Sequence, residues 1–80
     1  MQPGTEMNYE ELRAEAARLV AESDKSQIKI GEELDVSSGA ISRAISETGS
    51  KFANLQRRII RLLTPYRVEE EVTFRVREDP

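Results

Sequence analysis

The sequence predicts a mainly α-helical domain of four helices followed by one β-strand at the C-terminal end. Two observations lead to this fold class. Along residues 8–63 apolar side chains recur at spacings of three and four, the period of helices that face a core. Along residues 67–80, in VEEEVTFRVRED, apolar and polar residues tend to alternate, which is typical of a strand. Eighty residues are enough for one domain, which we expect over residues 8–66.

The first helix is expected to begin after Asn8, because a short polar side chain suits the N-cap position. Residues 1–7 would be a flexible leader, and the helix would end before the polar run Ser-Asp-Lys-Ser at 23–26. Its apolar face would consist of Tyr9, Leu12, Ala16, Leu19 and Val20.

Residues 27–34 and 38–46 predict two short helices separated by a three-residue turn. Gly31 would let the second helix cross the first closely, and Ser37 or Ser38 would cap the second helix. The buried side of the second helix would hold Ala40, Ile41, Ala44 and Ile45.

A fourth helix is expected from residue 51 to about residue 63, because Pro65 disfavours helical angles in the residue before it. Gly49 would be a left-handed residue at the C-terminal end of the third helix. The inward side of the fourth helix would carry Phe52, Leu55, Ile59, Leu62 and Leu63. Its polar side carries Asn54, Arg57, Arg58 and Arg61, which would either contact phosphates or form an ordinary solvated face.

The composition argues against several kinds of chemistry. The chain has no cysteine and no histidine, so it cannot build a disulfide, a thiolate zinc site or a serine–histidine pair. We therefore expect neither an enzyme nor a bound metal, cofactor or small-molecule ligand. No stretch approaches the apolar length of a membrane span, so a cytoplasmic or nucleoid-associated protein is expected.

The net charge of −3 hides an uneven distribution along the chain. Residues 1–24 hold two arginines against six acids, and residues 67–80 hold three against five. Residues 25–66 hold seven basic residues against four acids. The net charge argues against a general nucleic-acid binder, but the middle of the chain is basic while its ends are acidic.

The stretch QIKIGEELDVSSGAISRAIS, from Gln27 to Ser46, resembles the helix-turn-helix of phage Cro and repressor proteins without a gap. The series V-x-x-x-A-I-x-x-A-I, from Val36 to Ile45, is especially similar to Cro. A final strand would also be Cro-like, whereas the helix at 51–63 resembles the repressors. One residue departs from the family pattern: many members have glycine where this chain has Asp35, which tolerates a left-handed conformation better than most residues.

The resemblance implies that the helix at 38–46 lies in the major groove of DNA and that its outward residues contact base edges. Serine can donate to or accept from a base, and arginine can bind guanine through two hydrogen bonds. The outward residues are Ser37, Ser38, Gly39, Ser42, Arg43 and Ser46. Gln27 resembles the glutamine with which family members contact phosphate. Further candidates for backbone contact are Lys25, Ser26, Lys29 and Lys51.

The expected function is sequence-specific binding of double-stranded DNA by a small transcriptional regulator. Three other interpretations stay open. The serine-rich helix could be ordinary exposed surface. The fold could dock a protein, as an antitoxin or assembly adaptor does, or it could be a purely structural oligomerisation domain.

A lone strand at residues 67–80 would need a partner, and the same segment of a second subunit could provide one. In an antiparallel pair centred on Thr73, Glu71 faces Arg75 and Glu69 faces Arg77 on both sides of the two-fold axis. We therefore expect a homodimer, with Val72, Phe74 and Val76 covering the core. The alternatives are a strand that folds back on the leader and a tail that orders only with a partner.

Overall fold

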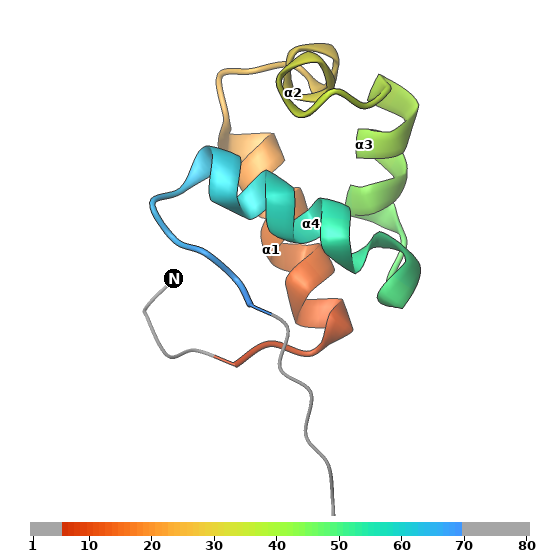
Figure 1. Cartoon of the computed structure of the whole chain (residues 1–80), viewed down its shortest axis with the longest axis vertical. Coiled ribbons are helices and arrows are strands. Elements are labelled where there is room, and N and C mark those ends of the chain that lie inside the picture. The colour runs from red at the N-terminus through yellow and green to blue at the C-terminus, as the bar shows by residue number, and fades with distance from the viewer. Residues whose placement is uncertain (1–5, 70–80) are drawn as a thin grey trace, which may run out of the picture.

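The computed structural model describes residues 6–69, which form four helices joined by short turns (Figure 1). The helices are α1 (Tyr9–Glu22), α2 (Gln27–Leu34), α3 (Ser38–Ser46) and α4 (Ser50–Leu63). All four lie where the sequence predicts them, with α4 beginning one residue earlier than expected.

The predicted fold class is wrong in one respect, because the described residues contain no β-strand and the protein is all-helical over this range. Residues 67–69, where the strand was expected to begin, have no regular secondary structure. Four helices offer no second strand to which the backbone of such a segment could bond. Glu69 is exposed, and its Oε1 lies 3.9 Å from Nε of Arg67. The other residues of the expected dimer contact lie outside the described residues: Glu71, Val72, Thr73, Phe74, Arg75, Val76 and Arg77.

The core is shared by all four helices. In Figure 1, α4 crosses in front of α1, with which it packs most extensively, and α3 packs against both. α2 lies at the top of this view and packs mainly on α3. The central cluster of buried side chains comprises Ala16, Val20, Ile30, Ile41, Ala44 and Ile59. Because α3 is in contact with every other helix, its orientation is set by the whole core.

Side-chain caps fix where the first three helices begin. The Asn8 side chain accepts a hydrogen bond from Glu11 N (2.8 Å), and the Glu11 carboxylate accepts one from Asn8 N (3.2 Å), which is a capping box. Ser26 Oγ caps α2 by accepting from Lys29 N (3.1 Å). Ser37 Oγ caps α3 in the same way through Ala40 N (3.0 Å). Each cap satisfies a backbone donor that the helix itself leaves unpaired.

The turn between α2 and α3 is unusually tight. Asp35 adopts the left-handed conformation (φ 59°, ψ 44°), as the resemblance to Cro and repressor proteins implies for this position. The amide of Val36 then donates back to the carbonyl of Gly31 (2.8 Å), which closes the C-terminal end of α2. A Cβ atom at Gly31 would lie 2.6 Å from the Val36 carbonyl oxygen. The close approach predicted for Gly31 is therefore to the backbone of the turn.

The turn between α3 and α4 corrects a second expectation. Gly49 has a positive φ (133°), but it occupies the N-cap position of α4. The residue that ends α3 is Glu47, which is extended and donates its amide to Arg43 O (2.9 Å). Gly49 supplies a backbone angle that residues with a side chain rarely adopt, so the chain can reverse between the two helices.

A matched pair of substitutions tests the tight turn. Gly31→Ala should lower the free energy of unfolding by about 1–3 kcal/mol, because the added methyl overlaps backbone that cannot move aside cheaply. Gly39→Ala should leave stability unchanged or slightly higher, because its Cβ would meet only Ser37 Oγ at 3.8 Å. Urea unfolding monitored by circular dichroism measures both. Equal effects of the two substitutions would contradict this account of the turn.

Candidate nucleic-acid interface

α3 has one buried side and one exposed side that differ sharply in chemistry. Ile41 and Ala44 are completely buried. The predicted base-contacting residues are all exposed, namely Ser37, Ser38, Gly39, Ser42, Arg43 and Ser46. We call these six residues the α3 face. It carries no acidic residue and no large apolar side chain, so it is a narrow polar surface with a single positive charge.

The four serines of the α3 face are not equivalent. The Ser37 hydroxyl accepts the capping bond from Ala40, and the Ser46 hydroxyl donates to Ser42 O (2.8 Å). Ser37 can still donate a hydrogen bond and Ser46 can still accept one. Within residues 6–69 the side chains of Ser38, Ser42 and Arg43 have no hydrogen-bond or ion-pair partner, so these three are the most available to a ligand.

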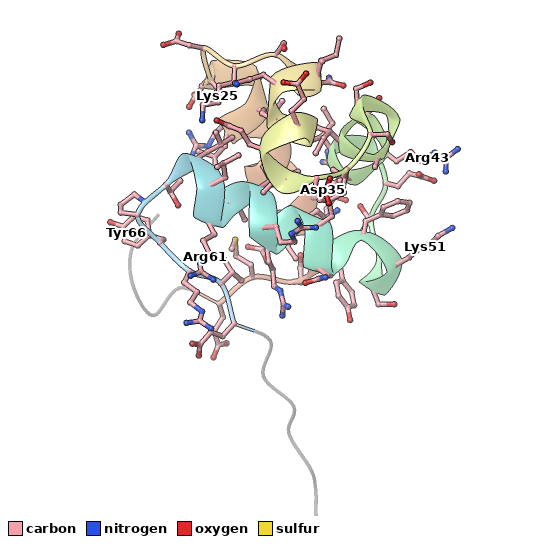
Figure 2. The ribbon with its side chains drawn as sticks, turned by 45° about the horizontal axis from the view of Figure 1, so that its top comes forward. Lys25, Asp35, Arg43, Lys51, Arg61 and Tyr66 are labelled. Carbon is pink, nitrogen blue, oxygen red and sulfur yellow. The ribbon has the colours of Figure 1, made fainter. Side chains whose placement is uncertain are left out.

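The structure brings only part of the predicted phosphate-contacting set to the side of the α3 face. Figure 2 shows Arg43 and Lys51 extending toward the same side of the molecule. Lys51 is exposed, and its Nζ lies 5.5 Å from the centre of the Phe52 ring. Lys29 is exposed and forms no ion pair with another described residue, and Gln27 is half-buried in the first turn of α2.

Lys25 and Ser26 have other roles in the structure. Lys25 Nζ lies 2.7 Å from the Glu33 carboxylate, and Figure 2 shows Lys25 far from Arg43. Ser26 uses its hydroxyl to cap α2. We therefore regard Lys25 as a weaker candidate for phosphate contact than Lys29 or Lys51, because its charge is already compensated by an acid.

The C-terminal end of α3 is held by a buried glutamine of α4. Gln56 is completely buried, and its Nε2 donates to Ala44 O (2.8 Å) and to Glu47 O (3.0 Å). These carbonyls belong to the end of α3, where the helix supplies few partners of its own. One side chain thus satisfies two backbone acceptors and ties α4 to the end of α3. Gln56 Oε1 is buried and accepts no hydrogen bond from the described residues.

A second contact with the same end of α3 comes from α1. Arg13 Nη1 donates to Ile45 O (3.0 Å), while its Nη2 pairs with Glu10 (2.6 Å). Glu10 also accepts a hydrogen bond from the Thr48 hydroxyl in the turn after α3. The Arg13 guanidinium, helped by Thr48, lowers the pKa of Glu10 to about 2. Glu10 therefore stays ionised even in mildly acidic solution, where its carboxylate still pairs with Arg13.

Sequence reasoning missed Gln56, the residue that fixes the candidate interface most directly. It has no role among the sequence predictions, although position 56 follows Phe52 by four residues and precedes Ile59 by three, which places it within the inward stripe of α4. A polar residue inside an apolar stripe is a recognisable signal of a buried hydrogen bond. The acceptors it would bind could not be identified, because they lie on another helix.

The remaining arginines of α4 have distinct surroundings. Arg58 donates to the carbonyl of Leu34 at the end of α2, which makes it a link between helices. Arg57 Nη2 donates to Asn54 Oδ1 (3.2 Å), and Arg61 is exposed. Among residues 6–69 no cluster of three or more potential metal ligands occurs. None of the four helices has the length and apolarity that crossing a bilayer requires.

The role of Gln56 can be tested by replacing it with methionine, which is similar in shape but has no donor. Gln56→Met should lower the free energy of unfolding by about 1–3 kcal/mol, because two carbonyls at the end of α3 lose their partner. Asn54→Ala, on the exposed side of the same helix, serves as the control and should change stability by less than about 0.5 kcal/mol. Urea unfolding compares the two. A Gln56→Met protein as stable as the native chain would contradict the role of this hydrogen bond.

Comparison of the chain with protein-family models, curated proteins and solved structures finds no match. The resemblance to Cro and repressor proteins therefore rests on residues 27–46 alone.

Proposed function

We propose that this protein binds double-stranded DNA in a sequence-specific manner as a small transcriptional regulator of the Cro and repressor type, with α3 inserted in the major groove. The observation that carries the proposal is the α3 face, which combines exposed hydroxyls and one free guanidinium on a helix whose other side packs into the core through the buried Ile41 and Ala44. Such a helix fits the width of the major groove and presents groups that distinguish base pairs.

Selectivity would come from Ser38, Ser42 and Arg43, the members of the α3 face whose side chains have no partner among the described residues. Arg43 can bind the O6 and N7 atoms of guanine through two hydrogen bonds. The serine hydroxyls can either donate a hydrogen bond to a base or accept one from it. Gly39 adds no side chain, so the backbone at the start of α3 can approach the bases closely. The anchoring of α3 by Gln56 and Arg13 supports this role, because base recognition needs a helix held at a fixed angle.

Affinity would come mainly from phosphate contacts, which carry no sequence information. Lys29 and Lys51 are exposed cations in the first turns of α2 and α4. The first turn of α2 also offers backbone amides near Gln27, and helix N-termini favour phosphate groups.

Use of this surface for docking a protein is less well supported. Protein-binding surfaces depend on buried aromatic or aliphatic anchors. Two large apolar side chains are exposed in the described part of the chain, Tyr9 (48%) and Ile28 (63%), and both lie outside α3. The α3 face has no comparable anchor, which favours DNA as its partner.

A two-fold symmetric DNA site would indicate that two copies bind together. The homodimer expected from the sequence stays a prediction, since the residues assigned to its contact lie almost entirely outside the described range. The oligomeric state of the free protein can be measured by sedimentation equilibrium.

The proposed function is tested by selecting preferred sites from a random pool of duplex DNA with the native protein and with Arg43→Ala. The native protein should enrich a defined sequence that contains guanine. Arg43→Ala should lose about 1–3 kcal/mol of discrimination at that guanine, because the two hydrogen bonds to its edge are removed. Binding constants for the selected and mismatched duplexes measure the loss.

Two control substitutions separate base reading from charge. Arg18→Ala removes the same charge from α1, where Arg18 pairs with Glu15 and Glu22, and should leave the selected sequence unchanged. Lys29→Ala should weaken binding to all duplexes alike and make binding less dependent on salt. If the native protein enriches no sequence, or if Arg43→Ala selects the same site as strongly, the proposed function is wrong.

A further inference from the structure

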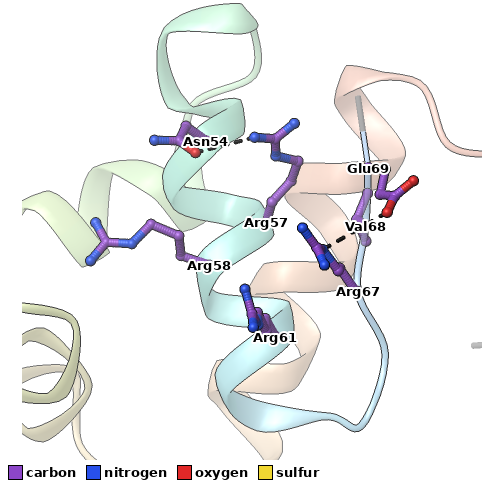
Figure 3. Close-up of a pocket in the computed structure, with 7 residues that line it drawn as sticks. All are labelled: Asn54, Arg57, Arg58, Arg61, Arg67, Val68 and Glu69. Atoms are coloured by element: carbon purple, nitrogen blue, oxygen red, sulfur yellow. Dashed lines mark hydrogen bonds and ion pairs between the residues drawn. The ribbon is translucent and has the colours of Figure 1, made fainter. Parts of the chain in front are cut away.

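Four arginines line one hollow of the surface, on the C-terminal half of α4 and the segment that follows it (Figure 3). We call this the arginine hollow. Its volume is about 380 Å³, and it is lined by Asn54, Arg57, Arg58, Arg61, Arg67, Val68 and Glu69. Among the residues 6–69 that line it, there are four guanidinium groups and one carboxylate.

The arginine hollow is separate from the α3 face. Lys51, in the first turn of α4, extends to the side of Arg43, whereas Arg61 lies toward the other end of α4 in Figure 2. Ten residues of helix between Lys51 and Arg61 correspond to about 15 Å along the axis. A ligand in the hollow would therefore not occupy the residues assigned to base reading, and an inference about the hollow does not depend on the proposed function.

The polar groups that the described residues present to the hollow are mostly hydrogen-bond donors. Asn54 Oδ1 accepts a hydrogen bond from Arg57 Nη2 (3.2 Å), so the Asn54 NH₂ group can serve as a further donor. Arg58 is held by its bond to Leu34 O. Arg67 and Glu69 are about two-thirds exposed, and their closest atoms are 3.9 Å apart. Exposed pairs of this kind contribute little and exchange readily for another anion.

We propose that the arginine hollow is a binding site for a phosphate group. Guanidinium groups match the oxygens of phosphate through paired hydrogen bonds, and an anion bound among several of them lowers their mutual repulsion. A tetrahedral phosphate presents its oxygens in three dimensions, whereas a flat carboxylate accepts mainly within its own plane. The phosphate can be a free anion or part of a nucleic-acid backbone, and both have the same chemistry at the site.

The test is a titration of the ¹⁵N-labelled protein with sodium pyrophosphate at constant ionic strength, observing the side-chain Nε–H signals of the arginines. The signals of Arg57, Arg61 and Arg67 should shift and saturate, while those of Arg18 and Arg43 should stay in place. Shifts that never saturate, or that are equal for all arginines, would overturn the site in favour of general ionic attraction.

Two substitutions distinguish a shaped site from a diffuse positive field. Arg61→Lys keeps the charge but removes the fork of donors, and should weaken pyrophosphate binding about tenfold. Glu69→Gln removes the competing carboxylate and should tighten binding. If Arg61→Lys binds as well as the native protein, charge alone is responsible and the proposal fails.

A parallel titration with a short duplex DNA identifies the source of the phosphate. If DNA shifts the signals of the arginine hollow and pyrophosphate displaces it, the ligand is a nucleic-acid backbone. If DNA shifts only signals of the α3 face, the ligand is a free phosphate anion. If DNA shifts the signals of neither the arginine hollow nor the α3 face while pyrophosphate still binds, the function proposed for α3 fails and the phosphate site stands.

Discussion

The position of α3 depends on one buried side chain, the amide of Gln56, which donates to two backbone carbonyls at the end of this helix. Helix α3 is only nine residues long, too short to be stable alone. Its N-terminal end is held by the tight turn at Gly31, and its C-terminal end by Gln56 and Arg13. Helices α4 and α1 thus provide the partners that α3 lacks. Because α3 is held at both ends by other parts of the chain, Ser38, Ser42 and Arg43 on its outer side are not needed to hold it in place.

This arrangement explains the division of residues on α3. The buried side is filled by Ile41 and Ala44, which join the common core. Apart from the Ser37 cap, the side chains of the α3 face take little part in holding the fold together, so Ser38, Ser42 and Arg43 are available to the DNA partner that we propose. Acidic side chains gather instead on α1, where Glu10, Glu15 and Glu22 pair with arginines of the same helix. The two arginines of α1 compensate only part of its negative charge, and α3 itself carries no acidic residue.

Much of the fold could be predicted because its signals are local. The caps Asn8 and Ser37 lie beside the helices they begin, and the apolar spacing marks each buried face. The left-handed conformation of Asp35 is expected from the resemblance to Cro and repressor proteins, many of which have glycine at this position. What failed depends on contacts distant in sequence. The carbonyl that Gln56 binds lies on α3, and Glu33, which pairs with Lys25, lies near the C-terminal end of α2. The alternating pattern after residue 67 resembles a strand, but the described fold offers it no strand to pair with.

We propose that the α3 face contacts the base edges of DNA in the major groove. The most direct measurement is to map backbone amide shifts of the labelled protein on adding the duplex that it prefers. The account predicts the largest changes in residues 37–46, with smaller ones in the first turns of α2 and α4, where the helix ends and Lys29 and Lys51 meet phosphates. Changes centred on α1, with residues 37–46 unaffected, would contradict it.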